Sequence, residues 1–113
     1  MKHTPIEFGI ETATLQDRLI IVTGRCYQGP ISVGDSFELI YTVKPVLIPS
    51  GYSPSARGPE RGAVLRVEVI RAYDHLLAEL DTGLTGELTL SGSGGELLRP
   101  GEVLGVKDIV DHK

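Results

Sequence analysis

The chain has 113 residues, a hydrophobic fraction of 41% and a formal net charge of −4. These values fit one folded domain over residues 1–113 and argue against disorder along the whole length. The single cysteine, Cys26, excludes an internal disulfide and a cysteine-rich zinc site, and the acidic balance argues mildly against nucleic-acid binding, which depends on Lys and Arg.

The start of the chain and its hydropathy carry no membrane signal. Residues 1–5 lack the apolar run of a signal peptide, and no apolar stretch approaches the roughly 20 residues that cross a bilayer. We therefore expect a cytoplasmic protein with no membrane partner. Fourteen glycines, seven prolines and the absence of Trp predict short strands, many turns and a core of Ile, Leu and Val.

The first part of the chain predicts two strands separated by a turn. Ile6, Phe8 and Ile10 alternate with polar or small residues, which is the period of a half-buried strand. Residues 12–18 are polar and predict a turn. Residues 19–22 form a continuous apolar run, which is typical of a buried strand.

The middle of the chain predicts a reversal, a strand and a long loop. Gly and Pro residues punctuate positions 29–35, and residues 37–43 alternate as a strand does. Residues 44–62 then hold four prolines among Ser and Gly, and proline lacks the backbone donor that a central strand needs. We expect residues 44–62 to form a long, mobile loop.

The second half predicts strands at residues 65–70, 87–90 and 103–106. Residues 74–81 have weak helical character and are expected to turn over one end of the fold. Residues 92–95 predict a hairpin tip, residues 99–101 a turn, and residues 108–113 a frayed tail. Six to seven short strands in a core of about residues 6–107 predict an all-β fold, a small closed antiparallel β-barrel, because closure removes exposed edges.

Four motifs follow one another along the chain. They are T-G-R-x-x-x-G-x-I-x-x-G-D at 23–35, V-x-x-I-R-A-Y at 67–73, E-L-D-T-G at 79–83 and L-R-P-G-E-V-L-G at 98–105. In this order they resemble domain II of the translational GTPases, the β-barrel of elongation factor Tu and its relatives. The resemblance covers about residues 8–106.

The resemblance implies a scaffold and says less about activity. In that family the barrel follows a GTPase domain and helps to contact tRNA or ribosomal RNA. No G-x-x-x-x-G-K-[ST] loop is present here, so we expect a stand-alone barrel that does not use GTP. The resemblance also implies structural turn positions, namely Gly24, Gly29, Gly34, Asp35, Gly83 and Gly101.

No group of residues predicts catalysis, a metal site or a cofactor. Residues 92–95 lack the spacing of a phosphate-binding fingerprint. Cys26 is interpreted as a small core residue, although a nucleophile–base pair of Cys26 with His75 stays open. Glu79 and Asp81 are interpreted as solvated acids on a turn rather than as an acid–base pair.

Basic and aromatic side chains are the candidate partner-binding residues. They are Arg57, Arg61, Arg66 on the outward face of its strand, Arg71, Tyr73 and His75. Because Arg and Tyr are enriched at protein interfaces, the leading hypothesis is a non-catalytic module that binds a protein partner, for example as a bacterial immunity or adaptor protein. Binding of RNA or the ribosome is the alternative, and an enzyme using Cys26 or His75 is the third hypothesis.

Overall fold

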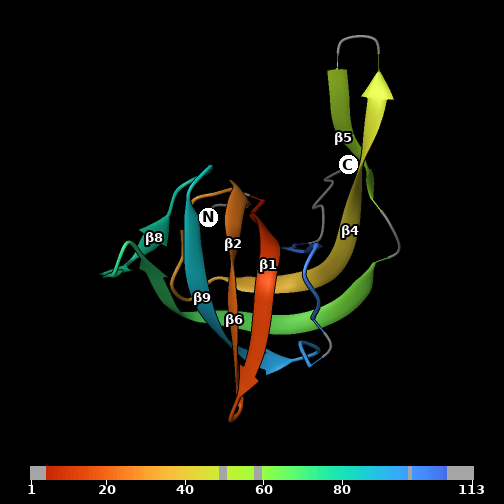
Figure 1. Cartoon of the computed structure of the whole chain (residues 1–113). Helices are drawn as coiled ribbons and strands as arrows, with labels where there is room; N and C mark the ends of the chain where they lie inside the picture. Colours follow the sequence, from red (N-terminus) through yellow and green to blue (C-terminus); the bar gives the residue numbers. More distant parts are fainter. Residues whose placement is uncertain (1–4, 49–50, 58–59, 97, 107–113) are drawn as a thin grey trace, which may run out of the picture.

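The computed structural model describes residues 5–48, 51–57, 60–96 and 98–106, with the backbone alone described over 44–48 and 51–57. Within these ranges the chain forms ten strands and no helix (Figure 1). The strands are β1 (Glu7–Gln16), β2 (Leu19–Gln28), β3 (Ile31–Ser32), β4 (Ser36–Ile48), β5 (Gly51–Arg57), β6 (Arg61–Ala72), β7 (His75–Leu77), β8 (Glu79–Leu80), β9 (Thr85–Ser93) and β10 (Glu102–Gly105).

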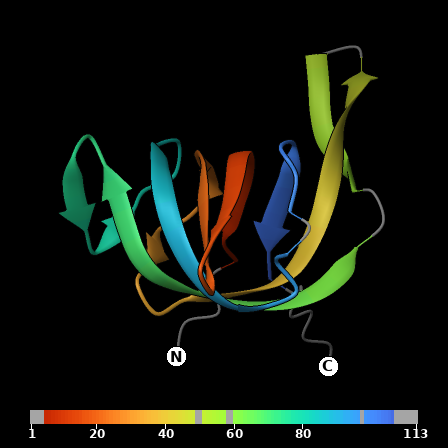
Figure 2. The ribbon, with the colours of Figure 1, turned by 60° about the horizontal axis from the view of Figure 1, so that its bottom comes forward.

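Six of these strands close into an antiparallel barrel. Their order is β4-β10-β1-β2-β9-β6, and a further pairing of β4 with β6 closes the ring. Beyond the ring, β5 pairs with β4 and β7 pairs with β6, so that these two hairpins leave the barrel on opposite sides (Figure 2). The predicted all-β closed barrel is therefore confirmed, and β3 with β8 adds a separate two-stranded sheet.

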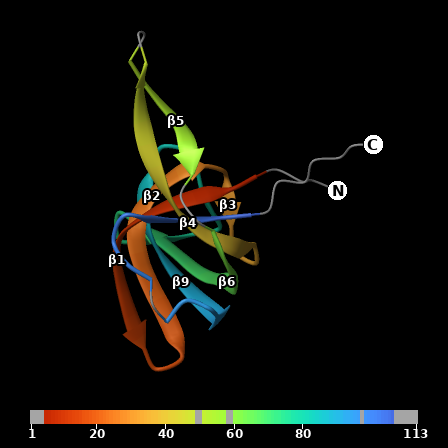
Figure 3. The ribbon, with the colours of Figure 1, turned by 90° about the vertical axis from the view of Figure 1, so that its right-hand side faces the viewer.

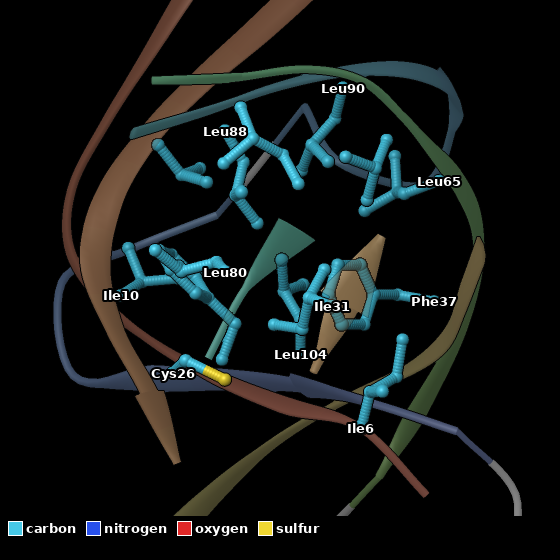
Figure 4. Close-up of a cluster of buried hydrophobic side chains, with 14 of the residues drawn as sticks. Ile6, Ile10, Cys26, Ile31, Phe37, Leu65, Leu80, Leu88, Leu90 and Leu104 are labelled. Carbon is cyan, nitrogen blue, oxygen red and sulfur yellow. The ribbon is translucent and has the colours of Figure 1, made fainter. Parts of the chain in front are cut away.

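The core is built from the inward residues of every barrel strand. Alternate side chains of a strand point to opposite faces, so Leu88 and Leu90 of β9 face inward together with Val22 of β2 and Val67 of β6. Figure 4 shows Leu88 and Leu90 with other aliphatic side chains gathered inside the ring, and Phe37 lies among them. Full burial of each such side chain contributes about 1.5–3 kcal/mol, which makes this cluster the main source of stability.

Register shifts let the long strands curve around this core. One lies between Ile10 and Thr12 of β1, one between Phe37 and Leu39 of β4, and one between Val67 and Val69 of β6. A bulge of this kind bends its strand and increases the local twist, which is how a flat sheet closes into a barrel.

A close approach between β1 and β2 requires glycine at position 24. A Cβ atom added to Gly24 would lie 1.8 Å from the carbonyl oxygen of Gly9, so no side chain fits between the two backbones. The other turn positions have their own geometry: Gly34, Gly83 and Gly101 have φ of 97°, 90° and 93°, Gly29 donates its N–H to Thr82 Oγ1, and Asp35 accepts the N–H of Ser32 at 2.8 Å.

The predicted turn over residues 12–18 is wrong. β1 continues to Gln16, β2 starts at Leu19, and Gln16 pairs with Leu19 across the hairpin. Two of the polar residues of this stretch are threonines, whose branched side chains suit a strand even where both faces are exposed. The β1–β2 hairpin therefore runs beyond the buried part of the barrel, with Leu15 exposed near its tip.

The predicted long loop over residues 44–62 is also replaced by strands. Residues 44–48 complete β4, residues 51–57 form β5, and the two pair as a hairpin that projects from the barrel (Figure 3). Both Pro45 and Pro54 lie at the register shift between the Lys44–Ala56 and Val46–Ser53 pairs. An edge strand with a bulge tolerates proline, so the prolines that predicted a loop are compatible with this hairpin. Residues 49–50 and 58–59, like the predicted tail 108–113, lie outside the described residues.

Two smaller expectations for the second half are corrected as well. Residues 92–95 do not form a hairpin tip, because Gly92 and Ser93 pair with β6 and the chain then crosses to β10, which lies beside β1 and β4. Residues 74–81 form no helix and instead contribute the short strands β7 and β8.

An ion pair joins the start of β6 to β10. Arg61 donates through both terminal nitrogens to the Glu102 carboxylate, at 2.7 and 3.1 Å, and the same carboxylate accepts the backbone N–H of Arg99 at 2.8 Å. The hydrogen bond from Arg61 lowers the pKa of Glu102, and the same bond raises the pKa of Arg61. Because the Glu102 side chain is only 12% exposed, this pair is better shielded from water than an ordinary surface pair.

The Gly24→Ala variant is expected to lower the free energy of unfolding by about 1–3 kcal/mol, because the added methyl group forces β1 away from β2. Gly62→Ala is the matched control, since an added Cβ at Gly62 meets no atom within 4 Å, and it should stay within about 0.5 kcal/mol of the parent. Chemical denaturation measures both. Equal effects of the two variants would contradict the close approach described above.

The Glu102→Gln variant is expected to lower the free energy of unfolding at neutral pH by up to about 1 kcal/mol. A carboxylate whose pKa is lowered by folding stabilises the protein above its unfolded pKa, and this stabilisation is lost as the pH falls through the folded pKa. The difference between parent and variant should therefore disappear in acid, where both side chains are neutral. Denaturation across an acidic pH series measures it, and a pH-independent difference would exclude this ion pair as its cause.

Candidate functional site

The structure separates the predicted partner-binding residues into three places. Four of them lie on β6, β7 and the turn between these strands: Arg66, Arg71, Tyr73 and His75. Arg61 lies at the start of β6 in its ion pair with Glu102. Arg57 ends β5, where only the backbone is described. The candidate site is therefore the β6–β7 side of the barrel.

The turn between β6 and β7 is a two-residue hairpin loop. Ala72 pairs with His75, and the two residues between them, Tyr73 and Asp74, have φ of 54° and 63°. Positive φ at both central residues is the mark of a type I′ turn, which matches the twist of the flanking strands and usually contains Asn and Gly. We call residues 72–75 the β6–β7 tip.

Tyrosine is an unfavourable residue at position 73. The left-handed conformation brings Cβ close to a carbonyl oxygen and costs roughly 1–2 kcal/mol for an L-residue, and bulky side chains adopt it rarely. Burial does not offset this strain, because Tyr73 is 73% exposed. Residues whose backbone strain is not offset by packing are concentrated at functional positions. Tyr73 is therefore the residue of the tip for which a role in binding is best supported.

The outward side of the neighbouring strands forms a continuous sheet surface, which we call the outer face. It is defined by the residues of β7, β6, β9 and β2 that point away from the core. Cross-strand pairing sets them in rows: Arg71 lies beside Glu87, and Glu87 beside Thr23, while Val69 lies beside Thr89, and Thr89 beside Ile21. Leu76 of β7 extends the first row, because it pairs with Arg71.

The outer face is mainly hydroxyl-bearing and aliphatic. Several of the exposed large hydrophobic side chains of the described chain belong to it: Leu19, Val64, Val69 and Leu76. Threonine and serine fill the positions between them on β9. Uncharged side chains are typical of the centre of a protein interface, and the row of Val69, Thr89 and Ile21 has this composition.

This surface carries charges of both signs. Arg66 Nε lies 3.9 Å from a Glu68 oxygen, and Ser91 donates to the same Glu68 oxygen at 2.5 Å. Arg71 and Glu87 are direct cross-strand neighbours, yet within the described residues neither side chain has an ion pair or a hydrogen bond. With Arg25 of β2, the outer face therefore carries three arginines and two glutamates.

The catalytic alternative finds little in this geometry. Cys26 is fully buried in the core, and burial raises the pKa of its thiol, whereas the active nucleophile would be the thiolate. His75 is exposed on the β6–β7 tip. Glu79 accepts the hydroxyl proton of Ser32 at 3.3 Å in the small β3–β8 sheet.

Two further searches cover the described part of the chain. No three side chains among its His, Cys, Asp and Glu residues gather as metal ligands would. Nor does that part contain a helix long and apolar enough to pass through a membrane.

An open depression of about 440 Å³ lies between β4, β6 and the end of β9. Small residues and backbone form most of its walls, and Glu38 is its charged group. The lining residues are Glu38, Gly62, Ala63, Val64, Ser93 and Gly94. Its one hydroxyl group, on Ser93, has no histidine or lysine base among the lining residues, so we place the candidate site on the β6–β7 tip and the outer face.

Sequence reasoning identified Tyr73, Arg66 and Arg71 but missed the rows between them. Val69, Thr89 and Ile21 come from three strands that are far apart in the chain, and only strand pairing puts them side by side. A usable signal was present, because β-branched residues occupy the outward positions of β2 and β9, where charged residues are usual on a solvated face.

Comparisons with known proteins agree with the fold. No protein-family model and no curated protein matches the chain. Among solved structures, it is similar to translation elongation factor SelB from Methanococcus maripaludis in the apo form, with a TM-score of 0.66 and 17% sequence identity. The similarity covers 95% of this chain and 20% of that chain, so the protein spans about a fifth of the length of the elongation factor.

At this level of identity the similarity establishes architecture. The match to an elongation factor, the closed ring of six antiparallel strands and the order of the sequence motifs agree with one another. The protein therefore has a translation-factor β-barrel fold, of the kind found in domain 2 of elongation factor Tu.

Proposed function

We propose that the protein is a non-catalytic binding module that recognises a protein partner through the β6–β7 tip, with Tyr73 as the central contact. The single observation that carries this proposal is the exposed tyrosine held in a left-handed conformation. Tyrosine supplies a large contact area at low cost in conformational entropy and is enriched among residues that dominate binding energy.

The surroundings of Tyr73 favour a protein over a nucleic acid. Leu76 follows it on β7 and is 69% exposed, which gives the tip an apolar neighbour. Glu68 and Glu87 lie among the arginines of the adjacent outer face, whereas a surface that tracks phosphates carries positive charge without such carboxylates. A role as a bacterial immunity or adaptor protein in the cytoplasm is one concrete form of this proposal, and the products of neighbouring genes are the first partners to test.

RNA or ribosome association is the second candidate, and the fold is the observation that favours it. The barrel resembles part of a translation elongation factor, and Tyr73 with Arg71 could stack on or pair with single-stranded RNA. The two candidates differ in how strongly salt weakens binding. RNA binding should weaken steeply, because phosphate contacts release counterions, whereas protein contacts release few.

The Tyr73→Asn variant is expected to be more stable than the parent and to bind its partner less well. Asn tolerates the left-handed conformation, so the free energy of unfolding should rise by about 1 kcal/mol. Loss of the aromatic contact should weaken the partner complex by about 2 kcal/mol, or roughly thirtyfold in Kd. Chemical denaturation measures the first effect, and titration of a partner isolated at fixed stoichiometry from native lysate measures the second.

Leu15→Asn is the matched control for this experiment, because Leu15 is an exposed apolar residue near the tip of the β1–β2 hairpin. Its partner affinity should equal that of the parent. The proposal fails if no stoichiometric partner is recovered, or if Tyr73→Asn binds as tightly as the parent does.

Under the leading proposal we expect no binding of tRNA or ribosomal RNA fragments at low ionic strength. Fluorescence anisotropy with labelled RNA measures this directly. Binding that weakens steeply with added salt, with a slope that falls by about 0.7 in Arg71→Ala, would instead support the RNA alternative.

A further inference from the structure

On the outer face, residues of opposite charge lie directly across from each other on two neighbouring strands. Arg71 on β6 and Glu87 on β9 are cross-strand partners, and so are Val69 on β6 and Thr89 on β9. An axis that runs along the strands, midway between β6 and β9, therefore has a cation on one side and an anion on the other side at the same height.

We propose that the outer face binds a second copy of this chain about a two-fold axis parallel to β6 and β9. Such an axis exchanges the two strands, so that β6 of each copy faces β9 of the other. Each Arg71 then faces the partner's Glu87, and each Val69 faces the partner's Thr89. The inference goes beyond the proposed function, because it does not involve Tyr73 or the β6–β7 tip.

The charges of Arg71 and Glu87 favour a second copy of this chain as the partner on this face. Within the described residues, the side chains of Arg71 and Glu87 make no ion pair with each other or with another residue. A second copy supplies the complementary charge for both groups at once, which is the self-complementarity that an isologous interface requires. A strongly charged partner of either sign would leave one of the two groups facing a like charge.

The uncharged row next to Arg71 and Glu87 also suits a contact between two copies. Val69 and Thr89 carry no charge, and Leu76 at the end of the neighbouring row is apolar. Two β-sheets that pack face to face use β-branched and aliphatic side chains of this kind, separated by about 10 Å. Because a barrel surface is convex, the contact is narrower than a standard interface of about 800 Å² per partner, and the dimer should be weak and dependent on concentration.

Exchange of the two charges tests this arrangement. Sedimentation velocity of the full chain up to about 1 mM is expected to show a reversible dimer. Arg71→Glu alone and Glu87→Arg alone each place two pairs of like charges in the interface and should raise the dimer Kd at least about tenfold. An equimolar mixture of the two variants restores both opposite-charge pairs, so it should dimerise as the parent does.

Three other variants complete the design. Arg18→Glu makes the same change of charge at an exposed residue of the β1–β2 turn and should leave dimerisation unchanged. Thr89→Lys puts an unpaired charge at the centre of the face and should abolish the dimer while Arg71 and Glu87 are unchanged. Tyr73→Asn should dimerise normally, which separates this inference from the proposed binding of a different protein.

The inference is overturned by a parent chain that stays monomeric across the concentration range. It is also overturned if either single charge variant dimerises as the parent does, or if their mixture stays monomeric. Circular dichroism of each variant confirms that a lost dimer reflects the interface and not the fold. Partner capture through Tyr73 can succeed or fail in every one of these cases.

Discussion

The pairing of β4 with β6 is the contact on which the rest of the structure depends. Without it, β10, β1, β2 and β9 would lie in an open sheet with the hydrophobic side chains of one face exposed to water. With it, the same side chains surround one another and the barrel strands lose their free edges. The bulge between Phe37 and Leu39 and the close approach at Gly24 serve this closure, because both let the backbone bend more tightly than a regular sheet does.

Closure also explains where the outlying elements are. β4 and β6 are the two longest described strands. β4 uses only part of its length in the ring, whereas β6 pairs with β4 or β9 from Arg61 to Arg71 and pairs with β7 along its other edge near its end. The remainder of β4 pairs with β5, and the end of β6 pairs with β7, so that the two hairpins extend from a rigid body on opposite sides. Binding residues placed on short hairpins and anchored by a closed barrel keep a fixed position, which reduces the entropy lost when a partner binds.

The β6–β7 side combines two kinds of surface with different physical properties. The tip presents one large aromatic side chain on a strained backbone. The outer face presents the uncharged Val69–Thr89 pair next to the oppositely charged Arg71–Glu87 pair. A single anchor suits the recognition of a separate protein, and a self-complementary face suits a second copy.

Much of the barrel was predictable from local patterns, because its residues answer to short-range rules. Alternation identified the inward residues of the strands, glycine and proline marked reversals, and Tyr73 with Arg71 stood out by chemical type. The same rules failed at residues 12–18 and 44–62, because polar strands and strands that contain proline occur at the exposed ends and edges of a sheet, and local sequence does not show which strand is an edge.

The all-β class, the burial of Cys26 and an order of motifs that resembles the translation-factor barrel follow from the amino-acid sequence alone. Only the tertiary structure decided that Arg61 is held by Glu102, that Tyr73 is strained, and that Arg71 lies beside Glu87. The physical reason is that side-chain periodicity is a property of one strand, whereas register between strands is set by the closure of the whole ring.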